Sequence, residues 1–505
     1  MTMTHPGLPL SWALGIVIAM LVTGVGVFLL DAGSERTRVV RLARLPLIGA
    51  PLQQLLRRPW LLLCLKILFV AVFLLIIFAG LYGTPIPERN FATVITWNIW
   101  WAALILSIFF LGTAWCGVCP WNTLASWLVP HRLWRRPVSS LSLNLKVPKA
   151  LRNLWPALLM FVILTWLELG AGITTDPKAT ASLALLMVVL AVVSAAIYED
   201  KAFCRFFCPV GRTVGAYSQL SMIELRPIEP DICARCTSLE CFKGSDSIAP
   251  CPMHLVMGRL TQNTYCIACG NCPQSCPRQN VGWQLRPPSR EAIQDARPRW
   301  DEAWFMLGLL ALTAFHGITM LPAWESLVTG LAQRIGDAAG PLISFTAGLG
   351  LDLAMVVALF ALAVRLTQWW SGNRQGFRKI FTAFSFVALP LAFAYHLAHN
   401  LNHLVRESSD LSALIANPLG SGTQPLSSME RHMRHLQMLI SQDGLFVLQS
   451  LLMVFGFWVA MRVIRHRRNG VLPGATWSLL PMVLFAVLIN LFHVWMLMQP
   501  MVMRM

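Results

Sequence analysis

Long apolar segments occupy most of this sequence, and they constrain its fold more than any other feature. Ten runs of about 20 residues carry almost no charge, and a run of that length spans a bilayer as a helix. Only 12% of the 505 residues are charged, about half the share in a soluble domain. We therefore expect about ten membrane-spanning helices, near residues 11–30, 60–83, 92–114, 153–172, 180–198, 302–322, 342–364, 380–401, 445–464 and 477–498.

One stretch, from about residue 200 to residue 300, interrupts the apolar pattern. It is rich in Cys, Pro, Arg and Asp, which is typical of a small soluble domain. The predicted fold class is an all-α polytopic membrane protein with a small α+β insert of ferredoxin type. The predicted domains are a first membrane half of five helices (1–199), the insert (200–290) and a second membrane half of five helices (291–505).

Basic residues indicate how the chain lies in the membrane. The net charge is +17, and 20 of the 40 arginines and lysines lie in the connections 31–59, 131–152, 365–379 and 462–468. These are alternate connections, and by the positive-inside rule they face the cytoplasm. We expect a multi-pass protein of a bacterial inner membrane, with the insert cytoplasmic, both termini periplasmic and no nucleic-acid partner. The first apolar run has no basic residue before it, so we expect a retained helix rather than a signal peptide.

The insert contains the strongest motif in the chain. Cys266, Cys269, Cys272 and Cys276 have the spacing of a bacterial ferredoxin, with a proline after the last cysteine. A looser run lies upstream, at Cys233, Cys236, Cys241 and Cys251. Eight cysteines match two [4Fe–4S] clusters, and a zinc site would need only four in two pairs. In the ferredoxin pattern Cys276 joins the upstream run and Cys251 joins the downstream one.

Two further cysteine pairs lie where predicted helices end on the cytoplasmic side. They are Cys116-x2-Cys119-Pro120 and Cys204-x3-Cys208-Pro209, and both follow an aromatic residue. Four thiols at one membrane depth are suited to a further metal or cluster, or to a dithiol switch. The structural alternative is small buried thiols at helix ends.

These cysteine motifs together resemble the NosR/NapH type of membrane polyferredoxins, over about residues 60–285. The membrane pairs match Cys116, Cys119, Cys204 and Cys208, and the ferredoxin matches the eight cysteines from Cys233 to Cys276. The resemblance implies a membrane electron carrier that accepts electrons from quinol or another donor. It also implies delivery to a periplasmic redox enzyme or to the maturation of a metal centre. The first membrane pair has x2 spacing where x3 is commoner, and the second membrane half lies outside the resemblance.

Histidines and methionines gather toward the predicted outer side of the second membrane half. Imidazoles within membrane helices are costly and tend to be functional, although each is also explained as an interfacial side chain. Three cofactors fit: Cu(I) with imidazole and thioether ligands, a haem b between two imidazoles, or a quinone. The candidate ligands are His316, His396, His399, His403, His493, Met501 and Met503.

The sequence thus predicts a membrane iron–sulfur electron-transfer protein. Its cytoplasmic [4Fe–4S] relay would be linked to a redox protein, quinone, haem or metal site in the outer half of the membrane. One alternative is a copper reductase or an assembly factor for a periplasmic metalloenzyme. Another is a redox sensor that uses the Cys-Pro pairs. Enzymatic activity, if present, would be of the quinol dehydrogenase or metal reductase type.

Overall fold

The computed structural model is largely helical. It describes residues 4–29, 39–129, 132–133, 136–137, 142–337, 340–372, 375–407, 411–427, 429–430, 438–472 and 476–502. Each of the ten predicted apolar runs is helical in these ranges. Within the described residues, eight helices are long and apolar enough to cross a membrane. They are α1 (Leu10–Leu29), α3 (Pro59–Tyr82), the span Phe91–Leu111 ending in α5 (Trp101–Leu111), α9 (Pro177–Ile197), α16 (Leu342–Trp370), the span Phe377–Arg406 with α17 (Phe377–Phe384) and α18 (Ala388–Glu407), α21 (Gln442–Arg468) and the span Thr476–Met498 with α22 (Leu480–Met498).

The other two apolar runs depart from the expected form. Helix α8 (Trp155–Leu169) has 15 residues, fewer than the roughly 20 that span a bilayer. Helix α14 (Trp300–Ile318) turns by 91° into α15 (Pro322–Ile335), and it qualifies as a candidate span only together with that helix. The described residues therefore support eight spans, or nine if the bent pair is counted as one, rather than the ten that the sequence predicts.

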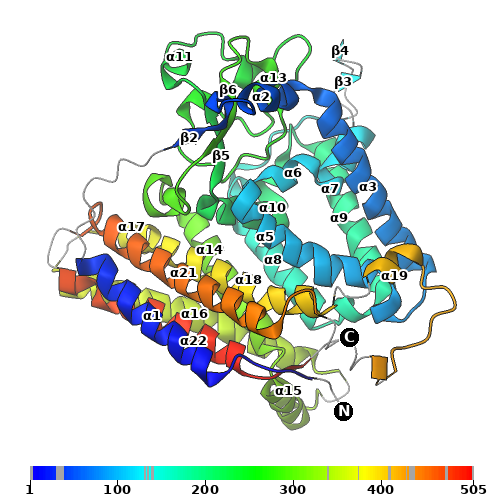
Figure 1. Ribbon diagram of the computed structural model, residues 1–505, viewed down its shortest axis with the longest axis vertical. Coiled ribbons are helices and arrows are strands. Elements are labelled where there is room, and N and C mark those ends of the chain that lie inside the picture. The colour runs from blue at the N-terminus through cyan, green and yellow to red at the C-terminus, as the bar shows by residue number, and fades with distance from the viewer. Residues whose placement is uncertain are drawn as a thin grey trace.

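Helix α18 lies at the centre of the second membrane half (Figure 1). Its apolar span is buried on all sides, by α5, α14, α21 and α22. Helix α1 packs against α21 and α22, so the first helix lies with the second half and not with the first half, where sequence order placed it. Helices α3, α5, α8 and α9 form the remainder of the first half, beside α14 and α18.

The two ends of the chain lie together. Strand β1 (Thr4–His5) pairs antiparallel with β7 (Met501–Val502). This pair lies at the end of the molecule opposite the cysteine-rich domain (Figure 1). Both termini are therefore on one side of the helical bundle and the cysteines on the other.

The cysteine-rich domain is built on a three-stranded antiparallel sheet in the order β2 (Val40–Arg41), β6 (Val281–Leu285), β5 (Ile223–Pro227). Residues 40–57, which the sequence analysis left in the first membrane half, lie against this domain. They supply β2 and α2 (Gly49–Arg57), and the Gln53 side chain donates to the Val281 carbonyl at 2.7 Å. The domain therefore includes a segment from before the second membrane helix.

Buried ion pairs fix this domain to the membrane helices. Arg226 contacts Glu224 at 2.9 Å and Glu291 at 3.0 Å, and Arg286 pairs with the same two carboxylates. The turn that carries Glu291 packs against α21, where Arg467 donates to the Ala292 carbonyl at 2.8 Å. Removing one partner of such a buried pair costs about 3–5 kcal/mol, so the position of the domain is well defined.

Candidate functional site

The first cysteine set consists of Cys233, Cys236, Cys241 and Cys276. Cys233 lies on α11 (Pro230–Ala234) and Cys241 on α12 (Glu240–Lys243). Burial raises the pKa of the Cys241 thiol, and the nearby thiols of the other three members raise it further. Cys233 and Cys276 also accept hydrogen bonds at 3.4 Å, from the Asn280 side chain and backbone respectively. The set therefore brings together three cysteines of the upstream run and the last cysteine of the downstream one.

The second cysteine set consists of Cys251, Cys266, Cys269 and Cys272. Burial raises the pKa of the Cys272 thiol well above its usual range, and the Cys269, Cys266 and Cys251 thiols raise it further. Cys272 also interacts with Cys241, so the first two sets are neighbours. The backbone N–H groups of Leu255 and Ala268 donate to Cys251 and Cys266 at 3.4 Å. Cys276 thus lies with the upstream run and Cys251 with the downstream one, and the binding of one cluster by each set stays a prediction.

The third cysteine set consists of the two Cys-Pro pairs. Cys116 lies on α6 (Ala114–Val118) and Cys204 on the turn η6 (Phe203–Phe207). Cys119 and Cys208 directly precede α7 (Pro120–Leu128) and α10 (Pro209–Tyr217), so each proline takes the first position of a helix, where its missing N–H costs nothing. Burial raises the pKa of the Cys116 thiol well above its usual value, and Cys119, Cys204 and Cys208 add to the effect. The structure thus brings the pairs together.

The second and third sets touch through their backbones. Gly117 lies between Cys116 and Cys119, and Ala268 lies between Cys266 and Cys269. A Cβ on Gly117 would lie 2.6 Å from the Ala268 carbonyl oxygen, so only glycine permits this approach. The three sets are therefore arranged in the order first, second, third, from the outer part of the domain to the helical bundle.

Buried cations accompany the inner cysteines. Burial lowers the pKa of Lys201, while Cys204, Cys269 and Cys119 favour its charged form. Its ammonium group donates to the Asn122 carbonyl at 3.3 Å and to the Ser126 hydroxyl. Arg212, 2% exposed, interacts with Cys204, Cys208 and Cys116. Positive charges at this point favour thiolates and a cluster of net negative charge.

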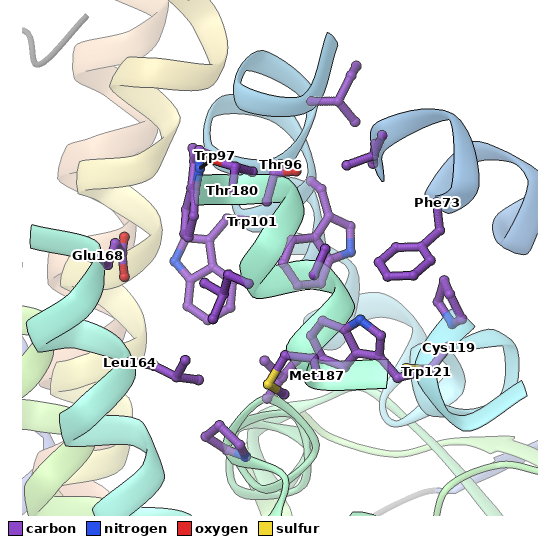
Figure 2. A pocket seen from close by; sticks show the side chains of 18 of the residues that line it. Phe73, Thr96, Trp97, Trp101, Cys119, Trp121, Leu164, Glu168, Thr180 and Met187 are labelled. Atoms are coloured by element: carbon purple, nitrogen blue, oxygen red, sulfur yellow. Dashed lines mark hydrogen bonds between the residues drawn. The ribbon is translucent and has the colours of Figure 1, made fainter. Parts of the chain in front are cut away.

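An apolar cavity of about 320 Å³ lies between the helices next to the third set. Figure 2 shows Cys119 on one side of it and Glu168 on the other. Aromatic rings form much of the wall, and Trp100 lies 5.7 Å from Trp115 and 6.2 Å from Trp121 between ring centroids. Among the described residues, the buried indole N–H groups of Trp115 and Trp121 have no hydrogen-bond acceptor. A bound carbonyl group would supply one.

The predicted outer histidines fall into separate surroundings. His316 on α14, His399 and His403 on α18 lie together, with ring centroids 5.2 Å apart for the first pair and 5.3 Å for the second. His493 on α22 instead stacks on Tyr395, at 4.3 Å and 16°. His396 contacts the Tyr217 hydroxyl at 3.1 Å.

Two of the candidate ligands, His396 and His403, are separated by two helical turns, about 10 Å of rise, so they have different neighbours. No three His, Cys, Asp or Glu side chains of the described chain are placed to hold a single metal ion. Met501 lies in β7 and lines a small polar cavity with His399, Asn402, Gln449 and Gln499. Met503 lies outside the described residues.

Two carboxylates within apolar helices, one half-buried and one buried, were not singled out from the sequence. Glu168, near the end of α8, has a carboxylate oxygen 3.8 Å from Nδ1 of His316. Asp352 on α16 is 5% exposed, and neither of its oxygens has a hydrogen-bond partner among the described residues. An acidic residue inside an apolar run was the available signal, because such residues are rare there and tend to be functional.

Comparison with known proteins supports the third cysteine set in particular. A family model described as a 4Fe-4S binding domain matches residues 93–137 and 180–218. These two segments contain Cys116, Cys119, Cys204 and Cys208 and stop before the ferredoxin run. The match therefore falls on the set for which the sequence had left cluster, metal and dithiol open.

Two relatives resemble parts of the chain. The chain is 27% identical over 215 residues to an uncharacterized protein of Methanocaldococcus jannaschii, covering 42% of this chain and 79% of that protein. It is 26% identical over 158 residues to the "Putative electron transport protein YccM" of Escherichia coli, covering 30% of this chain and 42% of that protein. The chain thus spans less than half of the second relative. No solved structure matches. The domain match supports at least one iron–sulfur cluster in a chain whose helices are compatible with a membrane, and the second relative is named as an electron transport protein.

Proposed function

We propose that this protein carries electrons between a quinone in the membrane and a redox partner at the cysteine-rich end, through three [4Fe–4S] clusters. Each cysteine set supplies four thiols, backbone N–H groups reach several of the sulfurs, and the sets adjoin in series. Such donors suit iron–sulfur clusters, which exchange one electron each. The domain match on the third set supports a cluster there in addition to the two of the ferredoxin pattern.

The observation that carries the quinone site is the position of Cys119. This residue belongs to the third cysteine set and also lines the apolar cavity. A quinone is a flat apolar ring with two carbonyl groups. The tryptophan rings of the wall, which meet one another at tilted and edge-to-face angles, fit the ring, and the indole N–H groups of Trp115 and Trp121 fit its carbonyl oxygens. A molecule in the cavity would lie directly beside the third set.

The same arrangement supports a direction across the membrane. The basic connections lie on the side of the cysteine-rich domain, which the positive-inside rule assigns to the cytoplasm of a bacterial inner membrane. The paired termini then face the periplasm. A cytoplasmic redox protein would meet the first cysteine set, whose Cys236 and Cys241 lie nearer the surface than Cys266 and Cys272 do.

Quinone binding is tested by filling the cavity. A short-chain menaquinone analogue should quench the tryptophan fluorescence of the anaerobic, fully loaded protein and change the EPR line shape of one cluster. Ala184→Trp places a bulky ring in the cavity wall and should abolish both effects. Leu185→Trp, on the same helix with a side chain that is 40% exposed, is the matched control and should preserve them. Equal quenching in the wild type and Ala184→Trp, with unchanged EPR spectra, would contradict the assignment.

A further inference from the structure

We propose that Glu168, His316 and His399 form a proton path from the apolar cavity to the end of the molecule that carries the termini. This inference rests on the proposed quinone site. It assigns a role to Glu168 of the first membrane half and to His316 and His399 of the second, which the electron relay does not use. The consequence is that electrons and protons leave the cavity in opposite directions.

The chemistry of the cavity requires a proton acceptor. Oxidation of one quinol to quinone breaks two O–H bonds and releases two electrons and two protons. The electrons reduce two oxidised iron–sulfur centres by one electron each, in two successive transfers at the Cys119 side. The cavity wall is otherwise almost entirely apolar, and its carboxylate is Glu168, on the side opposite Cys119 (Figure 2). Reduction of quinone would use the same groups in reverse.

From Glu168 the next titratable group is His316 on the neighbouring helix α14. The carboxylate oxygen and Nδ1 are 3.8 Å apart, and the two side chains are 18% and 20% exposed. That separation exceeds a hydrogen bond, so transfer needs a rotation of the carboxylate or one bridging water. Both groups are anchored on helices that pack against each other, so the distance is set by the fold.

His399 continues the path on the central helix. Its ring centroid lies 5.2 Å from that of His316, and the residue is 2% exposed. Neither of its ring nitrogens has a hydrogen-bond partner among the described residues, so both are available to accept and release a proton. The other titratable groups around it are His396, His403 and Tyr395 on α18, and His493 on α22, which stacks on Tyr395. Arg406 donates at 2.8 Å to Asn402, which lines a small cavity together with His399.

The path ends in a small polar cavity. His399, Asn402, Gln449 and Gln499 line it together with residues 6–8 near one terminus and Met501 near the other. This is the end of the molecule opposite the three cysteine sets (Figure 1). Amide side chains at this point suit ordered water and passage to the surface. Quinol oxidation would therefore separate charge across the membrane, with electrons moving to one side and protons to the other.

The test uses the full-length, cluster-loaded protein in liposomes that contain a pH-sensitive dye. A short-chain quinol is the donor, and external ferricyanide, which does not cross lipid, accepts electrons from molecules whose cysteine-rich end faces outward. We expect acidification of the lumen at one proton per electron. Glu168→Gln, His316→Gln and His399→Gln should each lower that acidification at least tenfold, while Glu168→Asp keeps a carboxylate and should retain most of it. Glu325→Gln, an exposed carboxylate on α15, is the control.

Two readouts separate this inference from failure to fold and from the proposed function. All path variants should keep their cluster EPR signals, and the His316 and His399 variants, which lie outside the cavity wall, should also keep their quinone-induced fluorescence quenching. The infrared difference spectrum between quinone- and quinol-loaded protein should contain a carboxyl band that Glu168→Gln removes. Proton release to the outside, or full lumenal acidification in Glu168→Gln, would overturn the path and leave the quinone site intact. No quinol-dependent electron transfer in the wild type would overturn the quinone site and the path together.

Discussion

Gly117 and Ala268 lie in contact, and this contact joins the membrane cysteines to the ferredoxin-type domain. Each residue sits between two cysteines of its own set, and a Cβ on Gly117 would approach the Ala268 carbonyl oxygen to 2.6 Å. Ala268 has a φ of 46°, in the left-handed region that few non-glycine residues adopt. The missing side chain of Gly117 on α6 and the left-handed backbone of Ala268 therefore accompany the close approach of the two cysteine sets.

Gly117→Ala should separate the second and third cysteine sets. The new methyl group meets a backbone atom that cannot rotate away, and overpacking of this kind costs about 1–3 kcal/mol. We expect all cluster EPR signals to persist while electron transfer between the two sets slows by at least tenfold in rapid-freeze EPR. Gly350→Ala, where no atom lies within 4 Å of the added methyl, should behave as the wild type. Wild-type kinetics in Gly117→Ala would show that the contact does not control transfer.

Three cysteine sets predict about twelve irons and about twelve sulfides per chain in an anaerobic preparation. Cys236→Ser should lower iron to about eight and remove one EPR signal, because a cubane cluster needs its four ligands. Cys64→Ser should change neither, since Cys64 is exposed on α3 and belongs to no set. An iron content near eight in the wild type would count against the cluster at the Cys-Pro pairs. Zinc in place of iron would count against all three clusters.

Thiol reactivity in cluster-free protein should follow burial. Burial raises the pKa of Cys119 to about 12, so its thiol is almost wholly protonated at pH 8. A hydrogen bond from the Leu239 backbone lowers the pKa of the nearly exposed Cys236 thiol, so it is more ionised than an ordinary cysteine. Alkylation followed by mass spectrometry should show Cys236 reacting at least tenfold faster than Cys119. Equal rates would mean that the third set is open to solvent.

Removal of the Lys201 charge should lower the reduction potential of the third cluster. The ammonium group interacts with Cys204, Cys269 and Cys119, and a cation there stabilises the added electron. A loss of about 1 kcal/mol corresponds to a shift on the order of 50 mV for a one-electron couple. EPR-monitored redox titration of Lys201→Met would measure it, with the exposed Lys178→Met as control. An unchanged potential would indicate that water or another group screens the charge.

Reporter fusions test the placement of the chain in the membrane. A reporter after Asn469, which follows the basic end of α21, should report the cytoplasm, and one after Met505 the periplasm. A reporter fused before residue 1 should agree with the one after Met505, because β1 and β7 pair. Opposite results for the two ends would conflict with the fold, whereas a joint reversal would conflict only with the orientation.

Local pattern in the sequence determined a large part of this protein. Hydropathy identified all ten apolar helical runs, because length and apolarity alone decide whether a segment can be a buried or lipid-facing helix. Cysteine spacing predicted that Cys276 joins the upstream run and Cys251 the downstream one, because in two-cluster ferredoxins the cysteine before the proline serves the other cluster. The structure places these two thiols beside those runs. A run of apolar residues carries no mark of a sharp bend, so the turn between α14 and α15 was not foreseen.

Only the tertiary structure decided which helices adjoin. Lipid tails are as apolar as the helix surfaces, so hydropathy does not specify helix partners, and the position of α1 against α21 could not be derived from it. The cavity beside Cys119 exists because helices distant in sequence leave a space between them. Glu168 lies beside His316 because α8 packs against α14. His399 rather than His396 faces His316 because the packing around α18 fixes the rotation of that helix about its axis.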